Sequence, residues 1–329
     1  MKITVVGHIC LDTIHRTLAA ADAVQAEPPA ELSYGGIFFS VAALANIAPA
    51  EATISPVFGV GKNEYPALIE RLQRYPNVDT AGIYKFDGPT NAVRLAYHGD
   101  ERRTECSKHI ADPIPFKRIK PFLDADMVLI DMISGYDVTL ETLDEIRMTV
   151  REDHTPIYFD VHCLALGLDE DCVRFPRTLT AWRRWLFWLH AVQMNEEEAA
   201  ALPQESFTEE QFAKQITALN TPAFILTRGA KGCTVFIDRH KHITKHDFSG
   251  AAIDRQIDST GCGDVFGAAY CAKFLTTKDI LQSVEFANSV AGFKAALVGS
   301  KDIDQLTAFR IKKQANSSIA SPKVMEVKP

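Results

Sequence analysis

A stretch near the end of the chain combines backbone hydrogen-bond donors with a carboxylate: Asp258-Ser259-Thr260-Gly261-Cys262-Gly263-Asp264. Its two glycines let neighbouring N–H groups point together, because no Cβ obstructs them. The apolar spacing that follows predicts a helix, whose positive dipole end would join this cluster of amides. An anion hole beside a carboxylate is what phosphoryl transfer to a hydroxyl requires. The alternative is an ordinary helix start, with Ser259 or Thr260 as the N-cap.

The whole string is more specific than a lone G-x-G-D. It resembles the D-T-x-G-A-G-D signature of the ribokinase-like (PfkB-type) carbohydrate kinases, with Ser259 for a Thr and Cys262 for the usual Ala. Neither change removes a backbone amide or the final carboxylate. The resemblance implies that Asp264 takes the hydroxyl proton, while the amides of Gly261, Cys262 and Gly263 stabilise charge on the moving phosphoryl group.

Two N-terminal motifs fit a substrate site. Asp12 follows the first predicted strand, where ligands of open α/β sheets bind, although a loop Asp capping a turn is an equal alternative. Gly35 and Gly36 allow either close approach of backbone to a ligand or a simple turn. The resemblance implies that Asp12 accepts hydrogen bonds from sugar hydroxyls and that the G-G-x-x-x-N loop, here Gly35 to Ser40, lies under the sugar. Ser40 stands where Asn is common, and a Ser makes fewer hydrogen bonds.

Three C-terminal motifs fit a donor site. Asn195-Glu196-Glu197-Glu198 reads by itself as an acidic helix start, and Thr227-Arg228-Gly229-Ala230-Lys231-Gly232 as a turn. The resemblance implies ATP and Mg²⁺, with Glu198 holding Mg²⁺ through water and Asn195 near the phosphates. It also places Thr227, Gly229 and Gly232 along the nucleotide and Asn288 at the adenine. Residues up to Asp258 resemble a region that holds a monovalent cation in some members.

Short apolar runs alternate with helical patterns, which predicts an α/β fold with a mainly parallel sheet. The expected strands are Lys2–Val6, Ala52–Gly59, Met127–Ile130, Pro156–Val161, Ala191–Met194, Ala223–Thr227 and Cys233–Ile237. The expected helices are Phe38–Ile47, Glu64–Tyr75, Thr139–Arg151, Leu179–Leu189, Thr208–Leu219, Asp264–Leu275 and Ile280–Val298. Segments near 8–36 and 80–110 break this rhythm and could pair as a small β-sheet lid. We expect one ribokinase-like domain over 1–313 and a loose tail over 314–329.

Composition narrows the class of protein. The chain has 329 residues, of which 47% are hydrophobic and 23% charged, with a net charge of −7. The acidic balance argues against nucleic acid as the main partner. No run approaches the ~20 apolar residues that span a bilayer, and the first residues predict a buried strand rather than a signal peptide. Seven cysteines without C-x-x-C spacing favour reduced thiols in the cytoplasm.

Other clusters have simpler interpretations. His240, His242 and His246 alternate with basic residues, which favours a solvated hairpin over a metal site. Trp182, Trp185 and Trp188 predict a packed helix face, with a subunit contact as the alternative. The resemblance separately leaves open a homodimer formed through the lid. Arg94, Arg102 and Arg103 are expected in or near the lid.

Rival functions and the substrate remain as alternatives. A dinucleotide-dependent oxidoreductase lacks its G-x-G-x-x-G, and a Walker-type NTPase lacks its G-K-[ST]. A catalytically silent sugar-binding regulator disagrees with the retained Asp264 and glycines. In Asp160-Val161-His162-Cys163-Leu164, Leu164 stands where acid-sugar members of the family carry Arg. We therefore expect a neutral sugar or a nucleoside as the substrate.

Overall fold

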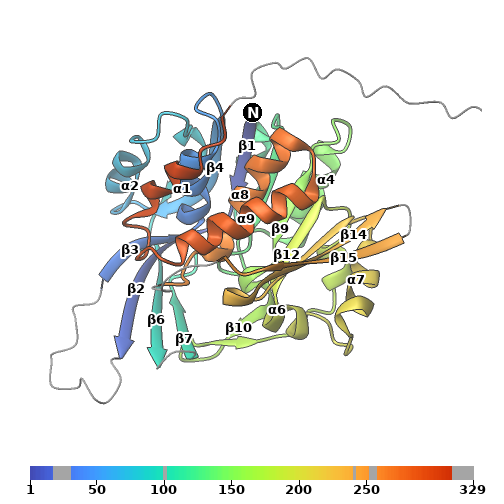
Figure 1. The fold of residues 1–329 in the computed structure, drawn as a ribbon. Coiled ribbons are helices and arrows are strands. Elements are labelled where there is room, and N and C mark those ends of the chain that lie inside the picture. The colour runs from blue at the N-terminus through green and yellow to red at the C-terminus, as the bar shows by residue number, and fades with distance from the viewer. Residues whose placement is uncertain (18–30, 99–101, 240–241, 252–257, 313–329) are drawn as a thin grey trace, which may run out of the picture.

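The computed structural model describes residues 1–17, 31–98, 102–239, 242–251 and 258–312. A large sheet forms its centre, with the strand order β15-β14-β13-β12-β9-β8-β1-β4-β5 (Figure 1). The strands from β13 to β5 run parallel, whereas β14 and β15 add antiparallel at one edge. Their bounds are β1 Lys2–Val6, β4 Thr53–Gly61, β5 Ile83–Phe86, β8 Met127–Asp131, β9 Ile157–Asp160, β12 Ala191–Asn195, β13 Ala223–Thr227, β14 Gly232–Arg239 and β15 His242–Ser249. The mainly parallel sheet expected from the sequence is confirmed.

Helices flank this sheet, and α8 packs against both α1 and α9 (Figure 1). The helices are α1 Ile37–Ile47, α2 Tyr65–Leu72, α3 Phe116–Ile119, α4 Leu140–Val150, α5 Trp182–Trp185, α6 Glu196–Ala201, α7 Glu209–Thr217, α8 Cys262–Thr277 and α9 Ile280–Lys294. Every residue of α1 is buried, since α1 lies between the sheet and α8. Through its contacts with α1, β8 and β9, α8 is held against the central strands.

A separate four-stranded sheet has the order β3-β2-β6-β7. It consists of β2 Ile9–Thr17, β3 Glu31–Gly36, β6 Asn91–His98 and β7 Arg102–Lys108, and β3 runs directly into α1. The second sheet expected from the sequence is therefore present. One part differs, because β5 within the 80–110 segment joins the edge of the large sheet beside β4. The short strands β10 Leu166–Leu168 and β11 Arg174–Pro176 pair with each other.

The expected helix over Leu179–Leu189 is wrong in extent. Only α5 forms, and Trp188 adopts the left-handed region with φ of 51°. Trp182 and Trp185 are buried, so the predicted packing of these rings is confirmed although the helix is short. In the described chain, His242 and His246 lie on the β14–β15 hairpin, as predicted, while His240 falls outside the described residues. The predicted tail over 314–329 also lies outside them.

Membrane insertion through a helix finds no support in this fold. None of the helices within the described ranges combines the length and the apolar character that crossing a bilayer demands.

His190, just before β12, makes stability depend on pH. Its Nε2 lies 3.0 Å from the Tyr270 hydroxyl, and its ring centroid lies 4.1 Å from that of Phe274. Burial, and then the charge of Lys278, lower its pKa from 6.5 to about 4. The unfolded chain binds this proton more readily, so the contribution of neutral His190 is complete above pH 6.5 and is lost as the pH falls towards 4.

We therefore expect His190→Phe to flatten the rise of unfolding free energy with pH across that window, measured by urea denaturation. The matched control is His242→Asn on exposed β15, which should keep the slope of the parent protein. Equal slopes in the parent and in His190→Phe would contradict the assignment.

Candidate active site

The turn before α8 is built around Gly261, the N-cap residue of that helix. Its φ is 77°, and a Cβ there would lie 2.4 Å from Cγ of Phe39. Only glycine satisfies both constraints, because other L-residues disfavour this region. Among the described residues no side chain caps α8, and the N-cap is Gly261 instead of Ser259 or Thr260, the residues that the alternative interpretation gave. The amide of Cys262 donates to the carbonyl oxygen of Ser259 at 3.2 Å, and the amides of Gly261 and Gly263 lie beside it at the helix start.

Asp264 lies in the first turn of α8 and is 5% exposed. Its Oδ1 has no hydrogen-bond partner among the described residues, and no ion pair holds its carboxylate within that part of the chain. A buried carboxylate oxygen without a partner is costly in an ordinary structural role, and such groups mark functional sites. Asp264 therefore has an oxygen available beside the helix start.

A buried aspartate and a buried lysine lie behind the turn. Asp258 accepts hydrogen bonds from the backbone N–H groups of Thr260 and Gly299, at 2.9 and 2.8 Å. Lys294, fully buried, donates to the carbonyl of Asp258 at 3.4 Å and lies 5.2 Å from the centroid of Phe39. Burial works to raise the pKa of Asp258, but Lys294 and the two N–H groups outweigh it and hold that pKa below its ordinary value. These contacts fix the turn from behind.

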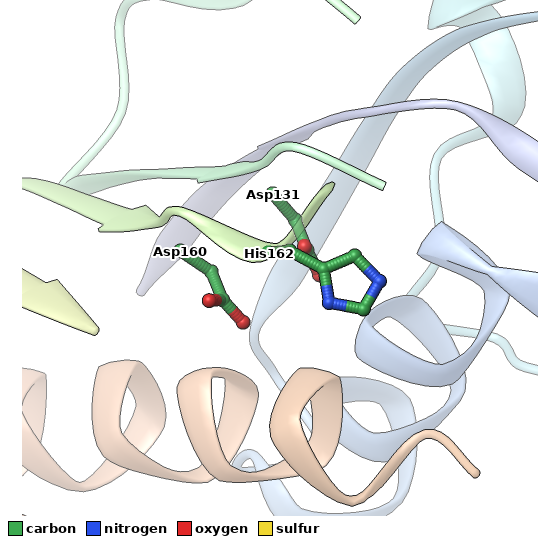
Figure 2. A group of neighbouring side chains, drawn as sticks. All are labelled: Asp131, Asp160 and His162. Carbon is green, nitrogen blue, oxygen red and sulfur yellow. The ribbon is translucent and has the colours of Figure 1, made fainter. Parts of the chain in front are cut away.

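Two strand ends bring further polar groups to the same place. Asp131 ends β8 and Asp160 ends β9, and His162 follows Asp160 after one intervening residue with φ of 40° (Figure 2). Their candidate ligand atoms all lie within 4.8 Å of one another. Burial, followed by the charges of Asp264 and Asp160, raises the pKa of Asp131 well above its ordinary value. Burial likewise raises the pKa of Asp160, although His162 opposes it.

Ser40 and Gln193 tie this cluster to α8. The hydroxyl of Ser40 donates to Asp131 Oδ2 at 3.1 Å and lies 3.2 Å from the carbonyl oxygen of Asp264. The amide of Gln193 donates to Asp160 Oδ2 at 2.9 Å and to the carbonyl of Gly263 at 3.1 Å. The motif search did not assign roles to Asp131, Asp160 or Gln193. The available signal was an acid directly after a buried apolar strand, as in Val-Leu-Ile-Asp and Tyr-Phe-Asp.

The small sheet supplies Asp12 and the double glycine. Asp12 lies in β2, 4% exposed and opposite Ser33, so it is a strand residue rather than a turn cap. A Cβ on Gly35 would lie 1.8 Å from Asp12 Oδ2, so the carboxylate rests on the glycine backbone. Gly36 has φ of 58° and leads directly into α1. The structure thus brings Asp12, Gly35 and Gly36 together.

The predicted donor residues lie along β12, β13 and α9. Asn195 and Glu198 form a capping box: Glu198 Oε2 accepts from Asn195 N at 2.8 Å, and Asn195 Oδ1 accepts from Glu198 N at 2.8 Å. Thr227 pairs with Asn195 in the strand register. The amide of Asn288 donates to the carbonyl of Ser249 at 2.7 Å and so joins α9 to β15. The structure therefore confirms the helix-start interpretation of Asn195 and Glu198. Donor binding by these residues stays a prediction.

Gly229 and Gly232 bound the short turn between β13 and β14. Their φ angles are 55° and 98°, and a Cβ on Gly232 would lie 2.0 Å from the carbonyl oxygen of Phe248. Gly229 has no atom within 4 Å of the same position. The turn therefore requires glycine at 232 for space and leaves open surface at 229.

A family comparison decides the class of protein. Residues 1–305 match the model of the pfkB family carbohydrate kinases. The chain belongs to this family. Among curated proteins, the Bifunctional protein HldE of Marinomonas sp. (strain MWYL1) is 31% identical to this chain over 106 residues. That alignment covers 31% of this chain and 21% of HldE, so the chain matches about a fifth of that protein.

Solved structures share the ribokinase-like fold of this family member. A pyrophosphate-dependent kinase in the ribokinase family aligns with a TM-score of 0.73 at 17% identity, covering 93% of this chain and 99% of its own. The ribokinase of Thermotoga maritima gives 0.71 at 19% identity, with 93% and 98% covered. Arabidopsis thaliana ribokinase, complexed with ribose and ATP, gives 0.67 at 19% identity, with the same coverage. These TM-scores establish the fold and confirm the α/β architecture expected from the sequence.

Proposed function

We propose that the protein transfers the γ-phosphoryl group of ATP to a hydroxyl of a small neutral sugar. The observation that carries the proposal is the unpartnered Oδ1 of Asp264 beside the uncapped start of α8. A carboxylate with an available oxygen can accept a hydroxyl proton, and amides at a helix start can stabilise a phosphoryl group. In this mechanism Asp264 is the general base, and the amides of Gly261, Cys262 and Gly263 form the anion hole.

The donor would lie along the β13–β14 turn. Thr227, Gly229 and Gly232 would approach the nucleotide, with Asn195 towards the phosphates and Asn288 towards the base. Phosphate oxygens accept hydrogen bonds, so backbone N–H groups and side-chain amide or hydroxyl donors of these residues would make the contacts to the phosphates. A monovalent cation would lie near Asp258, but the residues just before it, 252–257, fall outside the described chain.

Mg²⁺ would be held through water by Glu198. The donor set fits, because Mg²⁺ prefers carboxylate oxygens and the hydrogen bonds from Asn195 hold both oxygens of Glu198 in place at the start of α6. The charge of Glu198 also raises the pKa of Asp160, so this carboxylate acts on the cluster at the strand ends. When bound, Mg²⁺ supplies neutralising charge to the phosphates. The protein's own residues orient the hydroxyl and accept its proton.

The acceptor would lie between Asp12 and Asp264. Carboxylates suit sugar hydroxyls because each accepts two O–H bonds with defined geometry. Leu164 is buried at the position where Arg would meet an acid sugar. Arg174, on β11, lies 3.7 Å from Glu105, and this pair leaves little net charge for an anionic substrate. These features favour a neutral sugar, with a nucleoside as the alternative of the same fold.

The test is a coupled assay over neutral sugars, nucleosides and ketoaldonates, with ATP and pyrophosphate as separate donors and Mg²⁺ present. We expect turnover with ATP and a neutral sugar. Turnover with pyrophosphate alone would contradict the donor, and a ketoaldonate as the best substrate would contradict the acceptor. Thermal stabilisation by a sugar without turnover under any donor would instead indicate a silent sugar-binding regulator.

Gly35→Ala should impair sugar binding through Asp12. The new Cβ would lie 1.8 Å from Asp12 Oδ2, so the carboxylate must move from its position. Loss of a hydrogen bond to a charged acceptor costs about 1.5–3 kcal/mol, or roughly 10–100-fold in KM for the sugar. The KM for ATP should stay near that of the parent protein.

A double-mutant cycle with Asp12→Ala provides the control. If Gly35 acts through Asp12, the double variant should bind sugar no more weakly than Asp12→Ala alone. Additive losses would show that Gly35 contributes independently of that carboxylate.

A further inference from the structure

The strand ends beside Asp264 hold a group of side chains that the proposed phosphoryl transfer does not use. Asp131 and Asp160 come from neighbouring parallel strands, and His162 follows Asp160 after one residue. Figure 2 shows the three side chains directed into the space between these strand ends and the first turns of α8. We propose that Asp131, Asp160 and His162 bind a first-row divalent metal ion, separate from the Mg²⁺ at Glu198.

The spacing of the three ligands fits one ion. Their ligand atoms lie within 4.8 Å of one another. Ligands about 2.1 Å from a common ion lie roughly 3–4 Å apart, so the widest pair in this set needs to close by about 1–2 Å. Two carboxylates and one imidazole suit ions such as Mn²⁺, Co²⁺ or Zn²⁺, whereas Mg²⁺ disfavours a nitrogen ligand.

A second observation points to a missing partner. Asp131 Oδ1 and Asp264 Oδ1 have no hydrogen-bond partner in the described part of the chain, although their residues are only 1% and 5% exposed. Asp264 lies outside the three-residue group and close enough to Asp131 for the two carboxyl groups to interact. Buried polar atoms nearly always have a partner, and an ion or a water is the usual one when the protein supplies none.

The surroundings hold the ligands in place. Ser40 donates to Asp131 Oδ2 and Gln193 to Asp160 Oδ2, which leaves Asp131 Oδ1 available to an ion. Such outer hydrogen bonds orient ligating carboxylates. His162 is the only partly exposed member of the three and so lies on the side from which an ion can enter. An ion would offset the repulsion between carboxylates held away from bulk water.

Metal binding is measured on the full-length protein without nucleotide, so the result does not depend on the proposed phosphoryl transfer. After chelator treatment and dialysis, Co²⁺ is titrated by calorimetry and by its visible absorption, with Mg²⁺ as a competitor. We expect one Co²⁺ per chain, a spectrum of mixed nitrogen and oxygen ligation, and no displacement by millimolar Mg²⁺.

His162→Asn is the most informative variant, because Asn tolerates the left-handed conformation that His162 adopts. We expect this variant and Asp131→Asn to weaken Co²⁺ binding at least 30-fold, with the melting temperature recorded for each. His246→Asn, which removes a histidine on β15, should bind Co²⁺ as the parent does. Unchanged affinity in a folded His162→Asn protein, or no Co²⁺ bound by the parent at millimolar concentration, would overturn the proposal.

Discussion

Asp264→Asn should lower kcat by ~10²-fold or more while the affinity for ATP stays nearly intact, as expected on losing a general base. The fold should not suffer. The carboxylate that is removed has an unpartnered Oδ1, and the new amide can donate to the nearby Asp131. The melting temperature is therefore expected to stay the same or to rise, as happens when a strained functional group is neutralised.

Steady-state kinetics, ATP-analogue binding and thermal unfolding measure the three quantities on one preparation. Asp153→Asn, an exposed change of the same charge, is the matched control and should keep the activity of the parent. Near-normal turnover by Asp264→Asn would mean that another group takes the proton.

Gly261→Ala should cost both stability and activity. Alanine in the left-handed region costs about 1–2 kcal/mol, and displacing a packed ring costs about 1–3 kcal/mol more. Both apply here, because φ is 77° and the new Cβ would lie 2.4 Å from Phe39. A displaced Phe39 also disturbs the amides of the turn, so kcat should fall by more than about 10-fold, the loss expected from a weakened anion hole.

The control for stability is Gly229→Ala. Gly229 has a similar φ of 55° but no atom within 4 Å of its Cβ position, so only the backbone cost applies. Urea denaturation of both variants separates the two contributions. An equal loss of unfolding free energy in both variants would show that the ring of Phe39 can move aside at no cost in stability.

The local parts of the fold and of the site could be predicted from the sequence. The β-strands around Met127 and Ala223 are short apolar runs, and the turn at Gly261 carries its own signature of glycines and an acid. Leu179–Leu189 shows the limit of such patterns. Its tryptophans recur at helical spacing, yet the chain turns at Trp188 because tertiary packing decides where each ring is buried.

The cluster of Asp131, Asp160 and His162 depends on information that a pattern does not contain. Asp131 and Asp160 become neighbours only because β8 and β9 pair in one register, and Asp264 joins them through the packing of α8. Asn195 and Glu198 illustrate the opposite case. The same four residues satisfy a capping box and a ligand motif, so sequence alone could not choose between these roles.

The burial of Lys294 could not be predicted from the sequence either, since a lysine in a helix is ordinarily solvated. In the structure it is fully buried beneath the turn. Its ammonium group donates a hydrogen bond to the backbone carbonyl of Asp258. The carboxylate of the same aspartate accepts a hydrogen bond from the backbone N–H of Thr260. The basic group behind the glycine turn is thus a side chain of α9 and not an ion from solution. Dialysis and changes of buffer salt cannot remove this side chain, so a basic group behind the amides is a permanent part of the folded chain.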